Sequence, residues 1–283
     1  MIFLSPAKLN LVLKVKGKDP KDNYHYIESI FDPISLCDIL DVDITQDREI
    51  RVIDYFGKLK IGRKKNIVYR AVKLMADKYK FKCGVKITLY KHIPDGAGMG
   101  GGSSNAATAI LALNKLLGLK LGDAEMAETG FKCGADVPFF IYGKPSFVAG
   151  KGEKIREYKR KSVFWYVVVA HKAVKVATKD AYGWYDSEIH LTNVKSYTNI
   201  MYGYKNGGYA FLYNDFENII FKKYPVLKEV RDSLVRHHCI DASLSGSGSA
   251  VFALYDSRHA ALAGYIKAKS EWKGSFVGLA HSI

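Results

Sequence analysis

The segment that decides the fold is Ile93-Pro94-Asp95-Gly96-Ala97-Gly98-Met99-Gly100-Gly101-Gly102-Ser103-Ser104-Asn105. It joins a predicted strand at 84–90 to an alanine-rich helix that is expected to follow Ser104. Glycine has no side chain, so the backbone amides of such a loop are bare and can come close to a ligand. Ser103 or Ser104 is expected to cap the helix, whose N-terminus favours an anion. Together these features predict a phosphate-binding loop.

Two better-known phosphate loops fit this segment poorly. Gly96 to Gly101 formally matches G-x-G-x-x-G, but a dinucleotide fold also needs an acidic residue at the end of a strand ~20 residues further on. Asp123 instead falls in a turn between two predicted helices. No G-x-x-x-x-G-K-[ST] occurs, which excludes a Walker A loop. A merely flexible turn does not explain glycines joined to two serines and a helix start.

Strands and helices are expected on both sides of the loop. The alternation of Ala7, Leu9, Leu11, Leu13 and Val15 predicts a half-buried strand over 7–15. Further strands are expected at 26–34, 39–44, 49–54, within 162–171, and at 240–245, 249–255 and 275–280. Helices are expected after Asn66 and at 123–132, 178–185, 224–237 and 257–269. This mixture predicts an α+β protein with two domains, 1–152 and 153–283.

The composition is that of an ordinary globular protein. The 283 residues are 48% hydrophobic and 25% charged, and no apolar run approaches the ~18 residues of a membrane span. The N-terminus lacks a basic leader, so we expect a cytoplasmic protein without a membrane partner. The cysteines are far apart and form no C-x-x-C, which favours reduced thiols over a zinc site or a disulfide framework.

The net charge of +15 leaves several interpretations open. A nucleic-acid-binding protein would need a continuous basic stripe with interleaved aromatic residues. The lysines are instead dispersed along the chain, so we favour a solvated basic surface, part of which helps to hold a polyanionic small molecule. We therefore expect no nucleic-acid partner.

Two further segments carry groups that suit an anionic site. Lys8 and Asn10 lie two apart on the strand over 7–15, so they point to the same side, ~7 Å from each other. Asp136 is the one carboxylate in the apolar stretch Gly134–Phe140, where an acid is costly unless it is paired or functional. From these segments alone, a solvent-facing pair and a helix-capping aspartate remain open.

Three segments, in order and spacing, resemble the motifs of the GHMP kinase family. Ser5-Pro6-Ala7-Lys8-Leu9-Asn10 resembles the first, Pro94 to Asn105 the second, and Leu244-Ser245-Gly246-Ser247-Gly248-Ser249-Ala250 the third. The resemblance spans nearly the whole chain. It implies an ATP- and Mg²⁺-dependent kinase of small molecules. The implied fold has an N-terminal ATP-binding domain similar to a ribosomal-protein fold, a ferredoxin-like C-terminal domain, and the active site in the cleft between them.

The resemblance also implies roles for individual residues. Asp136 would orient or deprotonate the substrate hydroxyl, and Lys8 would stabilise charge nearby. Asn66 would lie on the adenosine side, and its position also suits a helix N-cap. The residues expected to bind the ATP phosphates are Pro94, Gly96, Ala97, Gly98, Met99, Gly100, Gly101, Gly102, Ser103, Ser104 and Asn105. No residue is assigned as a metal ligand.

A second set of residues indicates a branch of the family. Asn23-Tyr24-His25 resembles the G-Y-H of the members that act on a cytidine-diphosphate-linked methylerythritol. It departs from that pattern in Asn23 for glycine and in Tyr26 for a usual glutamate. The expected substrate-binding residues are Asn10, Tyr24, His25, Thr178, Tyr182, Gly246 and Ser247. Mevalonate, phosphomevalonate and homoserine are the alternative substrates, and the protein is expected to be a monomer or a weak homodimer.

Overall fold

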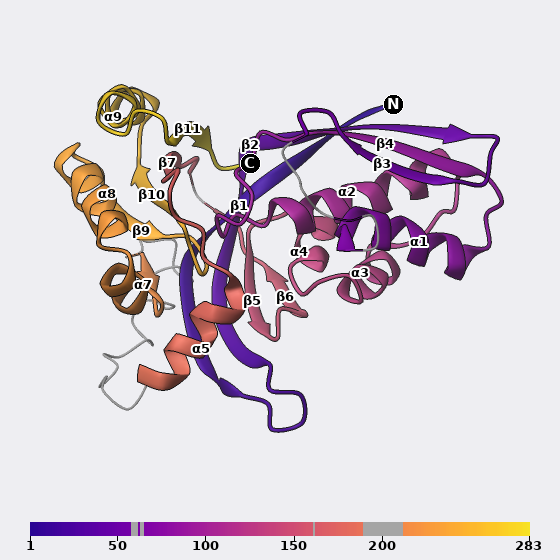
Figure 1. Ribbon diagram of the computed structural model, residues 1–283, viewed down its shortest axis with the longest axis horizontal. Coiled ribbons are helices and arrows are strands. Elements are labelled where there is room, and N and C mark those ends of the chain that lie inside the picture. Colours follow the sequence, from indigo (N-terminus) through magenta and orange to yellow (C-terminus); the bar gives the residue numbers. More distant parts are fainter. Residues whose placement is uncertain (58–61, 63–64, 161, 189–211) are drawn as a thin grey trace.

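The computed structural model describes residues 1–57, 62, 65–160, 162–188 and 212–283, and within them two β-sheets lie side by side (Figure 1). The first sheet is built on a long antiparallel pair, β1 (Ile2–Lys18) and β2 (His25–Thr45). Its order is β3 (Ile50–Asp54), β4 (Gly84–Tyr90), β2, β1 and β8 (Tyr213–Asn214). A hairpin of β5 (Ser146–Gly150) and β6 (Lys154–Glu157) is added alongside β2.

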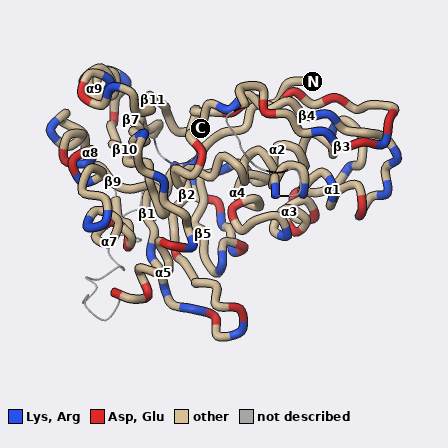
Figure 2. The backbone as a smooth tube through the Cα atoms, viewed as in Figure 1, with Lys and Arg blue, Asp and Glu red and all other residues tan. Residues whose placement is uncertain are grey.

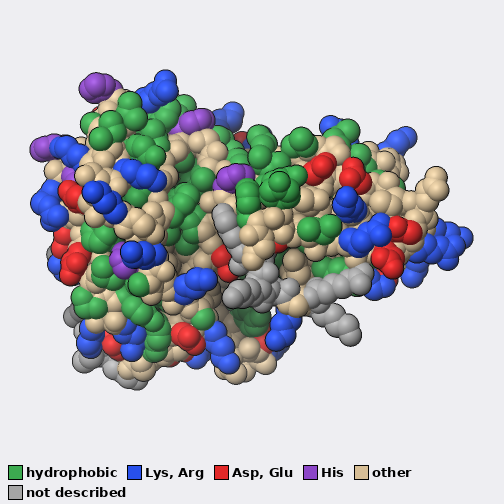
Figure 3. Space-filling model, turned by 45° about the horizontal axis from the view of Figure 1, so that its top comes forward, with side chains coloured by type: hydrophobic (Ala, Val, Ile, Leu, Met, Phe, Trp, Pro, Cys, Tyr) green, Lys and Arg blue, Asp and Glu red, His purple; other side chains and the backbone are tan. Residues whose placement is uncertain are grey.

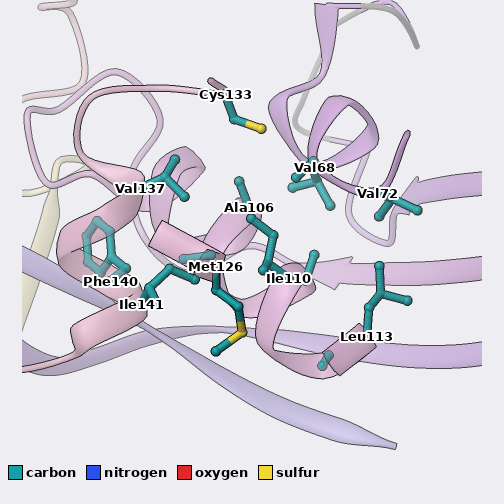
Figure 4. Close-up of a cluster of buried hydrophobic side chains, with 14 of the residues drawn as sticks. Val68, Val72, Ala106, Ile110, Leu113, Met126, Cys133, Val137, Phe140 and Ile141 are labelled. Carbon is teal, nitrogen blue, oxygen red and sulfur yellow. The ribbon is translucent and has the colours of Figure 1, made fainter. Parts of the chain in front are cut away.

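Four helices cover one face of the first sheet (Figure 1). They are α1 (Ile67–Tyr79), α2 (Gly101–Leu116), α3 (Asp123–Phe131) and α4 (Val137–Tyr142). Figure 4 shows how they meet: Val68 and Val72 of α1 and Val137 of α4 surround Ala106 and Ile110 of α2. The small residues of α2 let its neighbours approach closely, and this apolar core fixes where the helix starts relative to β1.

The second sheet has the order β11 (Phe276–His281), β7 (Trp165–Ala170), β10 (Ala250–Tyr255) and β9 (Asp241–Leu244). In chain order this is 4-1-3-2 with antiparallel neighbours, which confirms the expected ferredoxin-like arrangement. Its helices are α5 (Thr178–Glu188), α7 (Glu217–Lys223), α8 (Pro225–Arg236) and α9 (Arg258–Glu271).

The strand predicted over 7–15 is longer and more deeply buried than expected. β1 runs from Ile2 to Lys18, and residues 7–13 are buried whichever face they point to. The apolar face packs against the second sheet, while the other face lies beneath the glycine-rich loop and α2. The segments predicted as two strands, 26–34 and 39–44, form the single strand β2, in which the expected break is only a shift of register opposite Pro6 and Ala7.

The two sheets share buried contacts. Leu9 and Ile30 of the first sheet pack with Val168 and Phe252 of the second. At their border Asp32 is fully buried, receives a hydrogen bond of 2.6 Å from the Tyr166 hydroxyl and pairs with Arg160. Burial raises the pKa of Asp32 to about 6, and the Arg160 charge opposes this rise. The first sheet ends with β6 and the second begins with β7; the division between residues 152 and 153 stays a prediction.

Several short elements were not expected from the sequence, among them α4, α7 and β8. Each is too short to show a repeating hydrophobic pattern, and α4 is apolar along its whole length, so that periodicity cannot identify it.

Basic and acidic residues are scattered over all parts of the backbone tube (Figure 2). On the face shown in Figure 3, they are interspersed with hydrophobic side chains. Within the described parts of the chain, no helix is both long and apolar enough to cross a bilayer.

Candidate active site

A cavity of ≈ 330 Å³ brings together most of the residues that the sequence singled out. It is lined from β1, the glycine-rich loop, the start of α4, α5 and the Gly246–Ser247 turn. The predicted residues that line it are Lys8, Asn10, Pro94, Gly96, Ala97, Gly98, Met99, Gly100, Gly101, Gly102, Ser103, Asp136, Thr178, Tyr182, Gly246 and Ser247. Ser104, Asn105, Asn66, Tyr24 and His25 are not among the lining residues.

The glycine-rich loop runs directly into α2. The prediction that Ser103 or Ser104 caps this helix is wrong, because the helix begins at Gly101 and its N-cap is Gly100. Gly100 has φ +67, a left-handed conformation that lets the chain enter the helix earlier than a serine cap would. The first amides of a helix have no partner within it. At Gly101 and Gly102 they are therefore available to an anion in the cavity.

Both domains hold the loop in place. The Lys8 amide of β1 donates to the Met99 carbonyl at 3.1 Å, and the Ala250 amide of β10 donates to the Ala97 carbonyl at 3.0 Å. Ser245 Oγ donates to the Gly98 carbonyl at 3.1 Å. A β-carbon on Gly98 would lie 2.0 Å from the Ser245 carbonyl oxygen, so only glycine permits this approach. The loop is therefore clamped before any ligand binds.

Ser104 and Asn105 face away from the cavity toward β1. Ser5 Oγ makes hydrogen bonds of 2.7 Å with Ser104 Oγ and 2.8 Å with Asn105 Oδ1, and all three side chains are buried. These bonds tie α2 to the strand that carries Lys8. Asn66 is the N-cap of α1, since its Oδ1 accepts from the Val68 amide at 2.9 Å. Their ATP-binding roles stay predictions.

Lys8 and Asp136 face each other across the floor of the cavity. Lys8 Nζ lies 3.8 Å from Asp136 Oδ2, donates to Asn10 Oδ1, and sits 4.3 Å from the centre of the Phe31 ring. Burial lowers the pKa of the Lys8 ammonium, and the Asp136 carboxylate raises it. Asp136 occupies the N-cap position of α4, but its side chain accepts no capping hydrogen bond. Its carboxylate, one third exposed, is therefore free to face a ligand.

The opposite end of the cavity is aromatic. Thr178 Oγ1 and Ser247 Oγ lie 3.2 Å apart, joining α5 to the third glycine-rich segment. One turn along α5, Tyr182 stacks on His25 with ring centres 4.3 Å apart. His25 Nε2 also lies 2.7 Å from Asp186 Oδ1. Tyr24 is 62% exposed, so the structure joins His25, rather than Tyr24, to Tyr182.

The sequence reasoning did not predict seven of the lining residues: Leu13, Ile27, Phe31, Ile67, Lys91, Asp95 and Phe216. Phe31 and Phe216 are almost fully buried, and nothing in their apolar surroundings distinguishes them from ordinary core residues. Lys91 directly precedes the loop and pairs with the fully buried Asp38, whose other oxygen accepts from the His92 and Ile93 amides. A lysine at the end of an apolar strand could have signalled this position.

Among the residues that the structure describes, no group of three or more His, Cys, Asp or Glu side chains is arranged to hold a metal ion. Mg²⁺ commonly binds through one or two carboxylates together with substrate phosphates and water. The two carboxylates that line the cavity beside the phosphate loop, those of Asp95 and Asp136, suit that mode.

Comparison with known proteins agrees with this geometry. Residues 66–144 match the GHMP kinases N terminal domain, and residues 206–273 match the GHMP kinases C terminal domain. The chain is 34% identical over 275 residues to a 4-diphosphocytidyl-2-C-methyl-D-erythritol kinase of Syntrophotalea carbinolica, with 96% of each chain covered. It is 37% identical over 259 residues to the enzyme of that name from Pasteurella multocida, covering 92% of this chain and 83% of that one.

Solved structures give the same picture. A crystal structure of 4-(cytidine 5'-diphospho)-2C-methyl-D-erythritol kinase superposes with a TM-score of 0.82 at 31% identity and covers 99% of both chains. A homoserine kinase from Cytophaga hutchinsonii superposes with a TM-score of 0.73 at 17% identity, covering 100% of this chain and 93% of that one, and shows the fold alone. The chain, with its two-domain α+β fold, belongs to the GHMP kinase family.

Proposed function

We propose that this kinase transfers the γ-phosphate of ATP to a hydroxyl of 4-diphosphocytidyl-2-C-methyl-D-erythritol, giving the 2-phosphate. The observation that carries the proposal is the Lys8–Asp136 pair, 3.8 Å apart, beside the free amides at the start of α2. Full-length similarity to kinases named for this substrate supports the choice of acceptor. The product would enter the non-mevalonate route to isoprenoids.

The transfer asks mainly for positioning and charge stabilisation. The acceptor oxygen forms a bond to the γ-phosphorus as the bond from that phosphorus to the ADP oxygen breaks. Asp136 accepts a hydrogen bond from the acceptor hydroxyl and takes its proton as the new bond forms. Lys8 stabilises the charge on the transferring group, and the amides of Gly101 and Gly102 hold the phosphates that become ADP.

When bound, Mg²⁺ would neutralise part of the phosphate charge. Asp95 and Ser103 in the phosphate loop, and Asp136 at the start of α4, are lining side chains with oxygen atoms that could hold the ion.

The cytidine would lie at the aromatic end of the cavity. Tyr182 offers ring surface to a planar base, and Thr178 and Ser247 offer hydroxyls to its diphosphate. His25 adds a ring nitrogen beside this surface. Because Tyr24 is exposed at the tip between β1 and β2, its contact with the base would require that tip to close over the substrate.

An assay that couples ADP release to a spectroscopic signal tests the proposal. We expect turnover with the cytidyl alcohol and Mg²⁺, and none with mevalonate or homoserine. Robust turnover of mevalonate in the same assay would contradict the choice of acceptor, while leaving the kinase family in place.

A further inference from the structure

A chain of buried hydrogen bonds runs from the body of the first sheet to Lys8. Lys8 Nζ donates to Asn10 Oδ1, Asn10 Nδ2 lies 3.0 Å from Ser29 Oγ, and Ser29 Oγ donates to the Val12 carbonyl. Lys8, Asn10 and Ser29 are each at most 3% exposed. Of these residues, Ser29 lies outside every motif of the sequence and does not line the cavity.

A bulge in the β1–β2 ladder brings these groups together. Asn10 pairs with Phe31 and Val12 pairs with Ile30, so Leu11 is an extra residue on β1. Such an insertion re-aims the side chains around it. Here it places Asn10 and the Val12 carbonyl on either side of the Ser29 hydroxyl.

The Val12 carbonyl, the last acceptor in this series of hydrogen bonds, fixes the direction of each of them. A backbone carbonyl can only accept, so the single proton of the Ser29 hydroxyl must point to Val12. Ser29 Oγ can then only accept, and the group of Asn10 that faces it must be the NH₂. The amide oxygen of Asn10 is consequently turned toward the Lys8 ammonium.

The reversed amide would be penalised twice. Its oxygen would face a Ser29 oxygen that has no proton left to give, and its NH₂ would face the ammonium of Lys8. Both clashes would occur away from water, where an unpaired polar group is costly. Burial already disfavours the charged form of Lys8. The Asn10 oxygen that accepts from the ammonium therefore helps to keep Lys8 charged.

We propose that Ser29 is a positioning residue of the phosphoryl transfer: it fixes the amide of Asn10, and through it the place and charge of the Lys8 ammonium. This inference rests on the proposed role of Lys8. Ser29 touches neither substrate, so its contribution belongs to the chemical step, and the binding of ATP and alcohol should be largely independent of it.

The test compares Ser29→Ala with a matched control. We expect Ser29→Ala to lower kcat about tenfold, the scale of a lost hydrogen bond in a charged network, with both KM values nearly unchanged. Ser29→Thr keeps the hydroxyl and should retain kcat. Ser146→Ala removes another fully buried hydroxyl of the same sheet, which donates to the Lys144 carbonyl at 2.8 Å, and should leave kcat unchanged.

A double-variant cycle separates positioning from general packing. In an Asn10→Ala background, Ser29→Ala should cause no further loss, because the amide it orients is gone. Losses that multiply in the double variant, a normal kcat for Ser29→Ala, or a Ser29→Thr variant as slow as Ser29→Ala would each overturn the proposal. If Ser29→Ala does not fold, Ser29→Cys, with its weak S–H donor, takes its place in the cycle. All rates are ratios to wild type with whichever alcohol the wild type accepts, so a wrong acceptor would not imitate either result.

Discussion

The two ends of the cavity are built differently. At the phosphate end, backbone hydrogen bonds from both domains clamp the loop, and Lys8 is held by a buried network. At the aromatic end, Tyr182 packs against His25, while Tyr24 projects into solvent. The groups proposed for phosphoryl transfer are thus held in position before ligands bind. The proposed base-binding site is completed only when the substrate binds there. This contrast predicts that changes at the first end reduce kcat or ATP binding, and that changes at the second end reduce binding of the alcohol.

The largest effect is expected from Asp136→Asn. The amide keeps the shape of the side chain but cannot take a proton, so kcat should fall roughly 10²-fold or more. The protein should stay folded, because the Asp136 side chain makes no capping bond to α4, but losing the ion pair with buried Lys8 should lower the thermal midpoint. Steady-state kinetics and a melting curve measure the two quantities. A variant with nearly normal kcat would show that Asp136 only begins α4 and takes no part in the transfer.

The next effect concerns the phosphate loop. Gly100 is a poor probe, because its φ is +67 and an added β-carbon would lie 2.8 Å from the Phe140 ring. Gly102 is better, since its β-carbon would meet only Ile67 Cγ2 at 3.6 Å. Gly102→Ala should raise KM for ATP about tenfold, or ~1.4 kcal/mol, because its methyl group enters the cavity.

The stability of the Gly102→Ala variant provides the control. Alanine is favoured over glycine within a helix by about 1 kcal/mol, so the melting temperature should stay equal or rise. A variant that melts normally and binds ATP normally would contradict the phosphate-cradle interpretation of this loop.

The aromatic end should respond in KM for the alcohol. A base stacked on an aromatic side chain gains about 1–3 kcal/mol, so Tyr182→Ala should raise this KM at least about fivefold and leave KM for ATP nearly unchanged. Tyr182→Phe should be close to neutral, since the ring face binds the base. Equal losses for ATP and alcohol would show instead that Tyr182 mainly packs α5 against His25 and Phe216.

The smallest effect is expected at Ser104, and it distinguishes a residue that ties α2 to β1 from one that binds ATP. Ser104→Ala removes the 2.7 Å hydrogen bond to Ser5, which should lower the free energy of unfolding by about 1 kcal/mol. KM for ATP should change less than in Gly102→Ala. Chemical denaturation and ATP kinetics on the two variants make the comparison. A larger rise in KM for ATP in Ser104→Ala than in Gly102→Ala would instead indicate that Ser104 binds the nucleotide.

Much of the fold was predictable because its elements are long and patterned. The alternation from Ala7 to Val15 located β1. The start of α2 was wrong, since a left-handed glycine replaced the expected serine cap. The burial of Lys8 and Asn10 could not be foreseen either. It depends on the glycine-rich loop and α2 covering the second face of β1, a contact between segments more than 80 residues apart in sequence.

The same distinction applies to the site. The loop glycines, Lys8 and Asp136 belong to compact local motifs, so the sequence alone was enough to predict them as parts of one site. Ser29 and Asp186 act through partners distant in sequence, Asn10 and His25. Neither has a local pattern that marks it. Only the three-dimensional arrangement identifies such residues.

The central claim is that the Lys8–Asp136 cavity moves a phosphoryl group from ATP to the cytidyl alcohol. Phosphorus NMR of a reaction mixture with ATP, Mg²⁺ and 4-diphosphocytidyl-2-C-methyl-D-erythritol tests it most directly. We predict a new phosphomonoester resonance that grows in step with ADP and is nearly abolished in Asp136→Asn. ADP accompanied by inorganic phosphate alone, or a monoester formed equally fast by Asp136→Asn, would contradict it.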